Sequence, residues 1–298
     1  MPWLAPLRTA AESGDWPATK AFFAALTTED DRSFAASLVG TTAGAERYLE
    51  SAEAEEPGDP LVRTLLAERY VIAGWEIRSD HRATQVSAWQ FEQLHDHLRR
   101  AERLLIEVCA EYPDYALAWC VRLSTAMGLE LGQSESRRRY DRLTEHHPHL
   151  YAAQSALLQK LCPKWGGSWE AVDDFTRACV AAAPPGGYTG TLIAEAHLER
   201  WAEQGHAGGP GRLQDPAVRD ELVAAAAGSV LHPDFRPGAH ALSCHGYFAA
   251  TLSLGGHHTE AAPHFRAMGS GATSHPWEYL GDKQAAFLKH RATALAKG

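Results

Sequence analysis

The chain has 298 residues, 45% of them hydrophobic, and its 28 basic and 37 acidic side chains give a formal net charge of −9. This apolar content is enough to bury a core and is too high for an intrinsically disordered chain. The negative balance opposes binding to a nucleic-acid backbone or an anionic membrane by bulk electrostatics. We therefore expect neither kind of partner.

The first 60 residues predict two short helix pairs, and they are the least regular part of the chain. The first pair spans residues 3–27, with a turn at Gly14–Pro17 that places Pro17 near the first helical position. The second pair covers 31–56 and is broken at Gly40 and Gly44. An acidic linker with Gly and Pro then follows at 53–60.

In the middle of the chain, residues that can accept hydrogen bonds from a first helical turn predict the helix starts. Asp59, followed by Pro60, begins a helix over 61–77. After an insertion at 78–87, Ser87 begins a long helix to about residue 111, and Gln90 completes a capping box. Asp114, Ser134 and Ser168 begin helices that end near 131, 147 and 183, and another helix covers 149–162.

Helical spacing continues to the C-terminus, interrupted by glycine and proline. The predicted helices cover 189–204, 215–231, 238–254, 258–268 and 282–296, the last as a cap on the stack. Gly205–Pro210 is the most glycine-rich stretch and predicts a mobile loop. Because strand signals are almost absent, we expect an all-α fold of about 14 helices in a single domain, 1–298.

A repeat with a period of 35 residues supports this organisation. Leu105, Tyr140 and Phe175 are each preceded by a small residue four positions earlier. Each is followed three positions later by an apolar or small residue, and then by a proline. The flanking residues are Ala101, Ser136 and Ala171, then Val108, Leu143 and Ala178, then Pro113, Pro148 and Pro184. This pattern marks one face of a helix that ends before a proline, and its recurrence is typical of stacked helical hairpins.

The pattern resembles the tetratricopeptide repeat. The residues that carry the resemblance are Leu123, Ser124, Ser136, Tyr140, Leu143 and Pro148 in one repeat, and Phe248, Ala249, Gly256, Ala261, Phe265 and Met268 in another. Cys120 and His245 stand where the family has a characteristic tryptophan, and insertions interrupt the period near 78–87 and 205–214. The resemblance implies a right-handed superhelical solenoid of antiparallel helix pairs.

A narrower resemblance covers the segment Leu161–Ser168, which contains Lys-Trp-Gly-Gly-Ser. It is similar to a segment of bacterial tetratricopeptide-like proteins that have a domain of unassigned function. The stretch Trp75–Arg78 and the pair Pro276-Trp277 also fit that group. This resemblance implies an architecture and no particular chemistry.

Motifs for catalysis, cofactors and metals are missing. The five cysteines are widely spaced without a Cys-x-x-Cys pair, and they read as small core residues. His240 and Cys244 are four apart, so a metal would need a third ligand from another helix, and no His-Glu-x-x-His sequence exists. Nucleophile-elbow, phosphate-loop and dinucleotide sequences are also lacking. We expect no metal and no cofactor, and we favour a non-catalytic role over an enzyme.

No apolar run approaches the ~18–20 residues that span a bilayer. The N-terminal residues lack the basic head and apolar run of a signal peptide. The sequence therefore predicts a cytoplasmic protein.

Binding candidates come from the repeat alignment and from two clusters. The first helices of each pair would line a concave groove, at positions that include Gly128, Lys160 and Gly246. These positions are mostly small, so a ligand could enter the groove or the chain could fill it itself. The loop at 163–169 could recognise a partner through aromatic and cationic side chains, or Trp165 could pack while the glycines supply special backbone angles. The candidate ligand-binding residues are Trp75, Arg78, His81, Trp119, Arg122, Lys160, Lys164 and Trp165.

The leading hypothesis is a non-catalytic scaffold that binds a protein or peptide through the groove and the 163–169 loop. The alternative is a small-molecule-binding protein or enzyme. Its pocket would lie between 61–98 and the helices at 115–130 and 150–162, with Arg78, His81, Arg122 and Lys164 as polar contacts. A third interpretation is a homodimer that forms through an exposed end of the stack.

Overall fold

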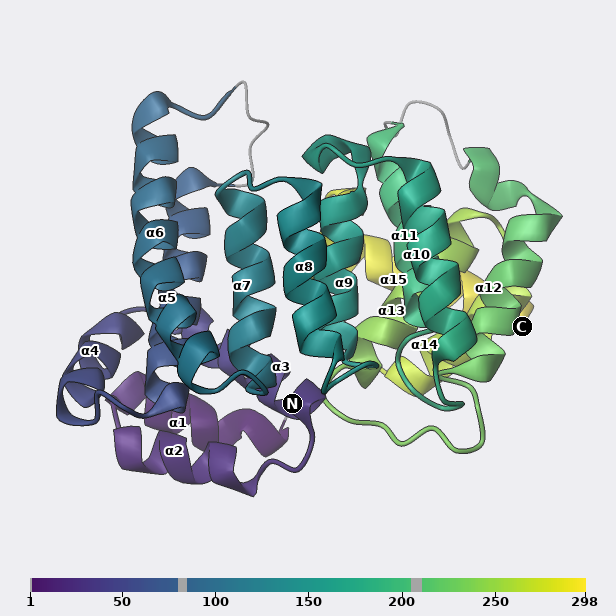
Figure 1. Cartoon of the computed structure of the whole chain (residues 1–298). Helices are drawn as coiled ribbons and strands as arrows, with labels where there is room; N and C mark the ends of the chain where they lie inside the picture. Colours follow the sequence, from purple (N-terminus) through teal and green to yellow (C-terminus); the bar gives the residue numbers. More distant parts are fainter. Residues whose placement is uncertain (1, 80–84, 205–210) are drawn as a thin grey trace. The chain divides into compact units, whose positions relative to one another are not determined.

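A computed structural model describes residues 2–79, 85–204 and 211–298 of the chain (Figure 1). Within these ranges every regular element is a helix and no strand occurs, which confirms the all-α prediction. The chain divides into two compact units, residues 1–160 and 161–298. The His81 candidate and the whole of the predicted 205–210 loop lie outside the described residues.

The first unit holds nine α-helices within its described residues, the last residue of α9 belonging to the second unit. They are α1 (Ala5–Ser13), α2 (Trp16–Ala25), α3 (Glu29–Thr41), α4 (Ala45–Glu55), α5 (Pro60–Arg78), α6 (Ala88–Glu111), α7 (Ala116–Gly128), α8 (Gln133–Thr144) and α9 (Tyr151–Leu161). Helix α5 is central, since it packs against α3, α4, α6 and α7. Two of its three arginines are buried with carboxylate partners, Arg63 with Glu107 and Glu111, and Arg69 with Glu46 and Glu76.

The described part of the second unit contains the remaining helices. They are α10 (Trp169–Ala182), α11 (Thr191–Glu203), α12 (Pro216–Gly228), α13 (Ala241–Leu254), α14 (His258–Met268) and α15 (Lys283–Lys297). Helix α13 packs against α11, α12, α14 and α15. Trp277, in a short 3-10 helix (Trp277–Leu280), is fully buried against Phe265 and Phe287.

The predicted caps are confirmed at several helices and wrong at two. Asp59 accepts hydrogen bonds from the amides of Leu61 and Val62, and Ser87 forms the predicted capping box with Gln90. The Asp114 cap is wrong because α7 starts at Ala116 with Tyr115 as its N-cap and no side-chain bond. The Ser134 cap is also wrong, since α8 begins at Gln133 and Ser134 therefore lies inside its first turn.

The repeat positions are buried in three different helices. Leu105 in α6, Tyr140 in α8 and Phe175 in α10 are at most 6% exposed. The small residues Ala101 and Ser136 are also buried. The third repeat departs from the pattern, because Ala178 is exposed.

Candidate functional site

The first predicted cluster lies at the end of α5. Trp75 and Arg78 are both half-buried, and the Arg78 guanidinium lies 5.9 Å from the Trp75 ring centroid and 5.8 Å from that of Phe91 in α6. Arg78 also donates a hydrogen bond to the carbonyl of Ser79 at 2.9 Å. This arginine therefore joins the end of α5 to the start of α6.

Trp119 and Arg122, one turn apart on α7, are both buried. The indole N–H of Trp119 donates to the carbonyl of Pro113 at 2.8 Å, which ties the helix to the preceding loop. The Arg122 guanidinium lies 5.2 Å from the Trp119 ring, a cation–π distance. The polar end of Trp119 is thus occupied within its own unit.

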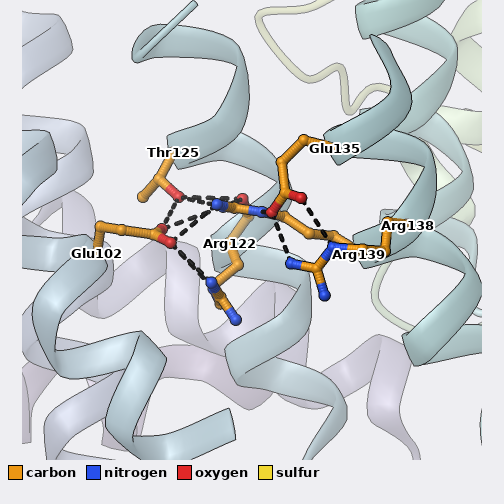
Figure 2. A network of polar contacts seen from close by, with 6 residues as sticks. All are labelled: Glu102, Arg122, Thr125, Glu135, Arg138 and Arg139. Atoms are coloured by element: carbon orange, nitrogen blue, oxygen red, sulfur yellow. Dashed lines mark hydrogen bonds and ion pairs between the residues drawn. The ribbon is translucent and has the colours of Figure 1, made fainter. Parts of the chain in front are cut away.

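Arg122 belongs to a charged network centred on Glu102 that joins α6, α7 and α8 (Figure 2). One Glu102 oxygen accepts from Arg122 at 2.8 Å and from Arg139 at 2.9 Å, and the other accepts from the Thr125 hydroxyl at 2.6 Å. The side chains of Glu102, Arg122 and Arg139 are 13%, 10% and 3% exposed. Charges this buried persist only when paired, so the network fastens three helices together.

Glu135 extends the network towards solvent (Figure 2). It accepts hydrogen bonds from Arg138 and Arg139, both at 2.8 Å. The bond from Arg138, assisted by Arg139, lowers the pKa of Glu135 to about 2. Arg138 is 55% exposed, so this end of the network is the part that water reaches.

Lys160 is buried near the end of α9, and burial lowers the pKa of its ammonium group although Glu130 opposes the shift. Its backbone carbonyl accepts a hydrogen bond from the side chain of Gln133 at 2.8 Å. Because the Lys160 side chain is buried, its ammonium group lies in a low-dielectric site, where the attraction between a cation and a neighbouring carboxylate is strong.

The predicted recognition loop at 163–169 begins the second unit, and its glycines have structural roles. Gly166 has φ +83°, and a Cβ on Gly167 would lie 1.9 Å from the carbonyl oxygen of Leu161. Trp165 is half-buried, and Ser168 caps α10. The backbone of the loop is therefore fixed by contacts of its own unit.

Lys164 of this loop leads to a buried glutamate that the sequence did not single out. Its ammonium lies 2.6 Å from Glu199 of α11, which also accepts a hydrogen bond from Tyr279 at 2.5 Å. The Glu199 side chain is only 3% exposed, and Glu195, one turn earlier, is fully buried. Burial and the Glu199 charge raise the pKa of Tyr279 far above its ordinary value. Only the i, i+4 spacing of two glutamates in an otherwise buried helix could have signalled this cluster.

Two of the predicted groove positions are filled by the chain itself. A Cβ on Gly128 would lie 2.5 Å from Leu98 Cδ1 and 3.1 Å from the Trp75 ring. A Cβ on Gly246 would lie 3.4 Å from Pro276 and 3.7 Å from the Trp277 indole nitrogen. In each unit, small residues thus permit close approach by a segment of that same unit.

Helix α6 carries a continuous exposed face, which we call the α6 stripe. It consists of Trp89, Glu92, Asp96, Arg99, Arg103 and Ile106, all exposed. The residues alternate in steps of three and four, the spacing of the seam between two coiled helices. Trp89 is 60% exposed and Ile106 49%, so each end of the stripe presents a large apolar side chain to water.

The charged centre of the stripe is incompletely paired. Arg99 lies 2.9 Å from Asp96 on the same helix, whereas within the described residues Glu92 and Arg103 have no hydrogen bond or ion pair. A groove of about 620 Å³ runs beside this centre. Its lining residues are Asp96, Arg99, Arg100, Glu102, Arg103 and Leu129. Arg100 also lines the groove, but its guanidinium donates hydrogen bonds to Glu50 of α4 and to the Tyr70 hydroxyl of α5.

The histidines that the structure describes were candidates for a metal centre with cysteines or carboxylates. No group of three or more His, Cys, Asp or Glu side chains within the described ranges could hold a metal ion. Two histidines, His245 and His264, contact each other in the interior of the second unit, where their Nδ1 atoms lie 3.0 Å apart. Burial lowers the pKa of His245 to about 4 and that of His264 to about 3, so both rings are neutral near pH 7.

Comparison of the chain with protein-family models, with curated proteins and with solved structures found no match. Of the helices in the described ranges, none combines the length and the apolar character needed to traverse a bilayer.

Proposed function

We propose that this chain is a non-catalytic, tetratricopeptide-like interaction protein whose helix pairs form a right-handed solenoid. The buried equivalents Leu105, Tyr140 and Phe175 support the repeat, since each occupies a helix core position at the same interval. Consecutive helices such as α5 and α6, and α13 and α14, pack closely along the chain, as such pairs would. Proteins built in this way expose extended surfaces that bind other proteins.

The α6 stripe is the observation that carries the proposal. The self-filled positions at Gly128 and Gly246 disfavour a peptide lying there, because Leu98 and Trp277 already occupy that space. The stripe, in contrast, is exposed and has the spacing that a partner helix requires. Exposed aromatic and arginine side chains are also the residue types that dominate protein interfaces. The binding surface is therefore the outer face of α6, and the partner presents a helix.

The loop at 163–169 contributes a second contact region in this proposal. Lys164 remains 40% exposed although it pairs with Glu199, and Trp165 is half-buried. A backbone already fixed in the free protein loses little entropy when a partner binds.

Site-specific photo-crosslinking in the native host tests the location of this surface. An Arg99→p-benzoylphenylalanine variant should give discrete protein adducts on illumination. The matched control is Arg142→p-benzoylphenylalanine, because the Arg142 side chain on α8 is also exposed, at 58%. Adducts restricted to position 99 support the proposal. Equal adduct patterns at both positions, or none at either, contradict it.

A small anionic ligand is the second candidate, because the groove beside the α6 stripe has a volume of about 620 Å³ and three arginines in its lining. Ligand sites commonly fall between about 300 and 1,000 Å³. Titration calorimetry with inorganic phosphate and with citrate tests this function. Saturable binding that Arg103→Ala weakens favours the small-molecule function. If neither probe gives a heat of binding at millimolar concentration, the small-molecule function is contradicted.

A further inference from the structure

The order of residues along the α6 stripe is self-complementary when two copies of the helix run antiparallel. In such a pair, residues whose numbers add to 195 lie opposite each other. The opposed pairs are Trp89 with Ile106, Glu92 with Arg103, and Asp96 with Arg99. Each apolar residue meets an apolar one and each acid meets a base. Because the arrangement is two-fold, every pair occurs twice.

The unpaired charges fit the same arrangement. Glu92 and Arg103 have no hydrogen bond or ion pair within the described part of their own chain, and they are the residues that oppose each other between copies. Asp96 and Arg99 are already 2.9 Å apart within one helix, so two such pairs would meet as a four-charge network. A parallel pairing would place like charges opposite each other, which is unfavourable.

The position of α6 leaves room for a second helix. Helix α6 packs against α5 and α7, which also contact each other, and it stands at the edge of the helices of the first unit (Figure 1). The stripe extends over 17 residue steps from Trp89 to Ile106, about 26 Å of helix. A contact between single helices of this length is at the low end of specific interfaces, so we expect a dissociation constant in the micromolar range.

We propose that the partner of the α6 stripe is a second copy of this chain, bound antiparallel along α6 to form a two-fold homodimer. This inference rests on the proposed function, since it assigns the partner of the same surface. The proposed interface is the exposed side of α6, whereas the sequence suggested an exposed end of the helix stack.

Sedimentation velocity between 1 and 200 µM tests the dimer. Wild-type protein should shift from monomer to dimer over this range, and 1 M salt should weaken association by screening the opposed charges. Arg103→Glu should raise the dissociation constant at least about tenfold, because it places two acids opposite each other twice. Glu92→Arg should do the same by opposing two bases. Arg142→Glu makes the same charge change outside the stripe and should leave association unchanged.

Mixing the two single variants gives the decisive measurement. The Glu92→Arg chain has positive charges at both positions of the pair, and the Arg103→Glu chain has negative charges at both. Neither should self-associate, yet an equimolar mixture should form heterodimers. The double variant, in which both charges are exchanged, should form homodimers. A wild-type chain that stays monomeric at 200 µM, or single variants that remain monomeric when mixed, overturns the homodimer. Photo-crosslinks from position 99 to other proteins would then still support the proposed function, whereas their absence would overturn both.

Discussion

The most direct test of the structure is removal of the charge at Glu102. Its carboxylate is the shared partner of Arg122 and Arg139, whose side chains are 10% and 3% exposed. In Glu102→Gln the side-chain volume is kept, but two buried guanidinium groups lose their common anion. Breaking a buried ion pair by removing one partner costs about 3–5 kcal/mol. Because Arg139 still pairs with Glu135 at 2.8 Å, we expect the lower end, about 3 kcal/mol.

Native-state hydrogen exchange of the α7 amides is the suitable assay, since it reports on the first unit alone. A loss of about 3 kcal/mol corresponds to a fall in protection of roughly two orders of magnitude. Arg138→Ala is the matched control. Its bonds to Glu135 lie at the exposed end of the network, so it should cost less than about 1 kcal/mol. Equal loss of protection in the two variants would refute the assignment of Glu102 as the buried centre.

Three further predictions concern packing, pH and the loop. Gly128→Ala should destabilise the first unit by about 1–3 kcal/mol, because its Cβ would meet Leu98 at 2.5 Å. Urea titration measures this loss, and in the same assay Gly228→Ala, in open space on α12, should be neutral or stabilising. The low folded pKa values of His245 and His264 mean that the unfolded chain binds more protons below pH 6.5. Stability of the second unit should therefore be complete above pH 6.5 and fall towards pH 4 by up to about 1.4 kcal/mol per pH unit per histidine. His245→Asn should reduce that slope in unfolding curves measured across this range, and an unchanged slope would contradict the assignment. Gly167→Ala should unfold the second unit by circular dichroism, since its Cβ would overlap a backbone carbonyl, whereas Gly166→Ala should cost only about 1 kcal/mol of strain.

The sequence predicted the helices well because their signals are local. Apolar spacing, an Asp or Ser before the first turn and a proline beyond the last turn act within a few residues. The two wrong caps show the limit of such signals. Asp114 and Ser134 are suitable residue types, but the observed α7 and α8 begin one or two residues away from where those caps would place them. The chosen start depends on packing between helices, which a short window does not contain.

The candidate sites were harder to predict because their partners are far apart in the chain. Arg122 was selected for its charge, yet its role is set by Glu102, 20 residues earlier, and by the burial they share. Lys164 was selected for its loop, and its partner Glu199 lies 35 residues away. Sequence spacing identifies a charged residue, but only the tertiary arrangement shows whether its charge is already neutralised.

The use of arginine within the first unit explains why charged side chains remain exposed on the α6 stripe. Arg63, Arg69, Arg122 and Arg139 are buried, and each is paired with a carboxylate of its own unit. Loss of its carboxylate partner costs a buried guanidinium far more free energy than it costs an exposed one. The buried arginines are therefore the ones that must be paired within the fold. Arg103 and Glu92 are left on the exposed face of α6, where water compensates each charge and neither destabilises the free protein. Charges of this kind add little to folding but select orientation and partner on contact, because a wrongly placed helix would oppose like charges. The same division of arginines therefore accounts both for the paired buried charges of the first unit and for the exposed charges on the surface of α6 that we propose as the binding site.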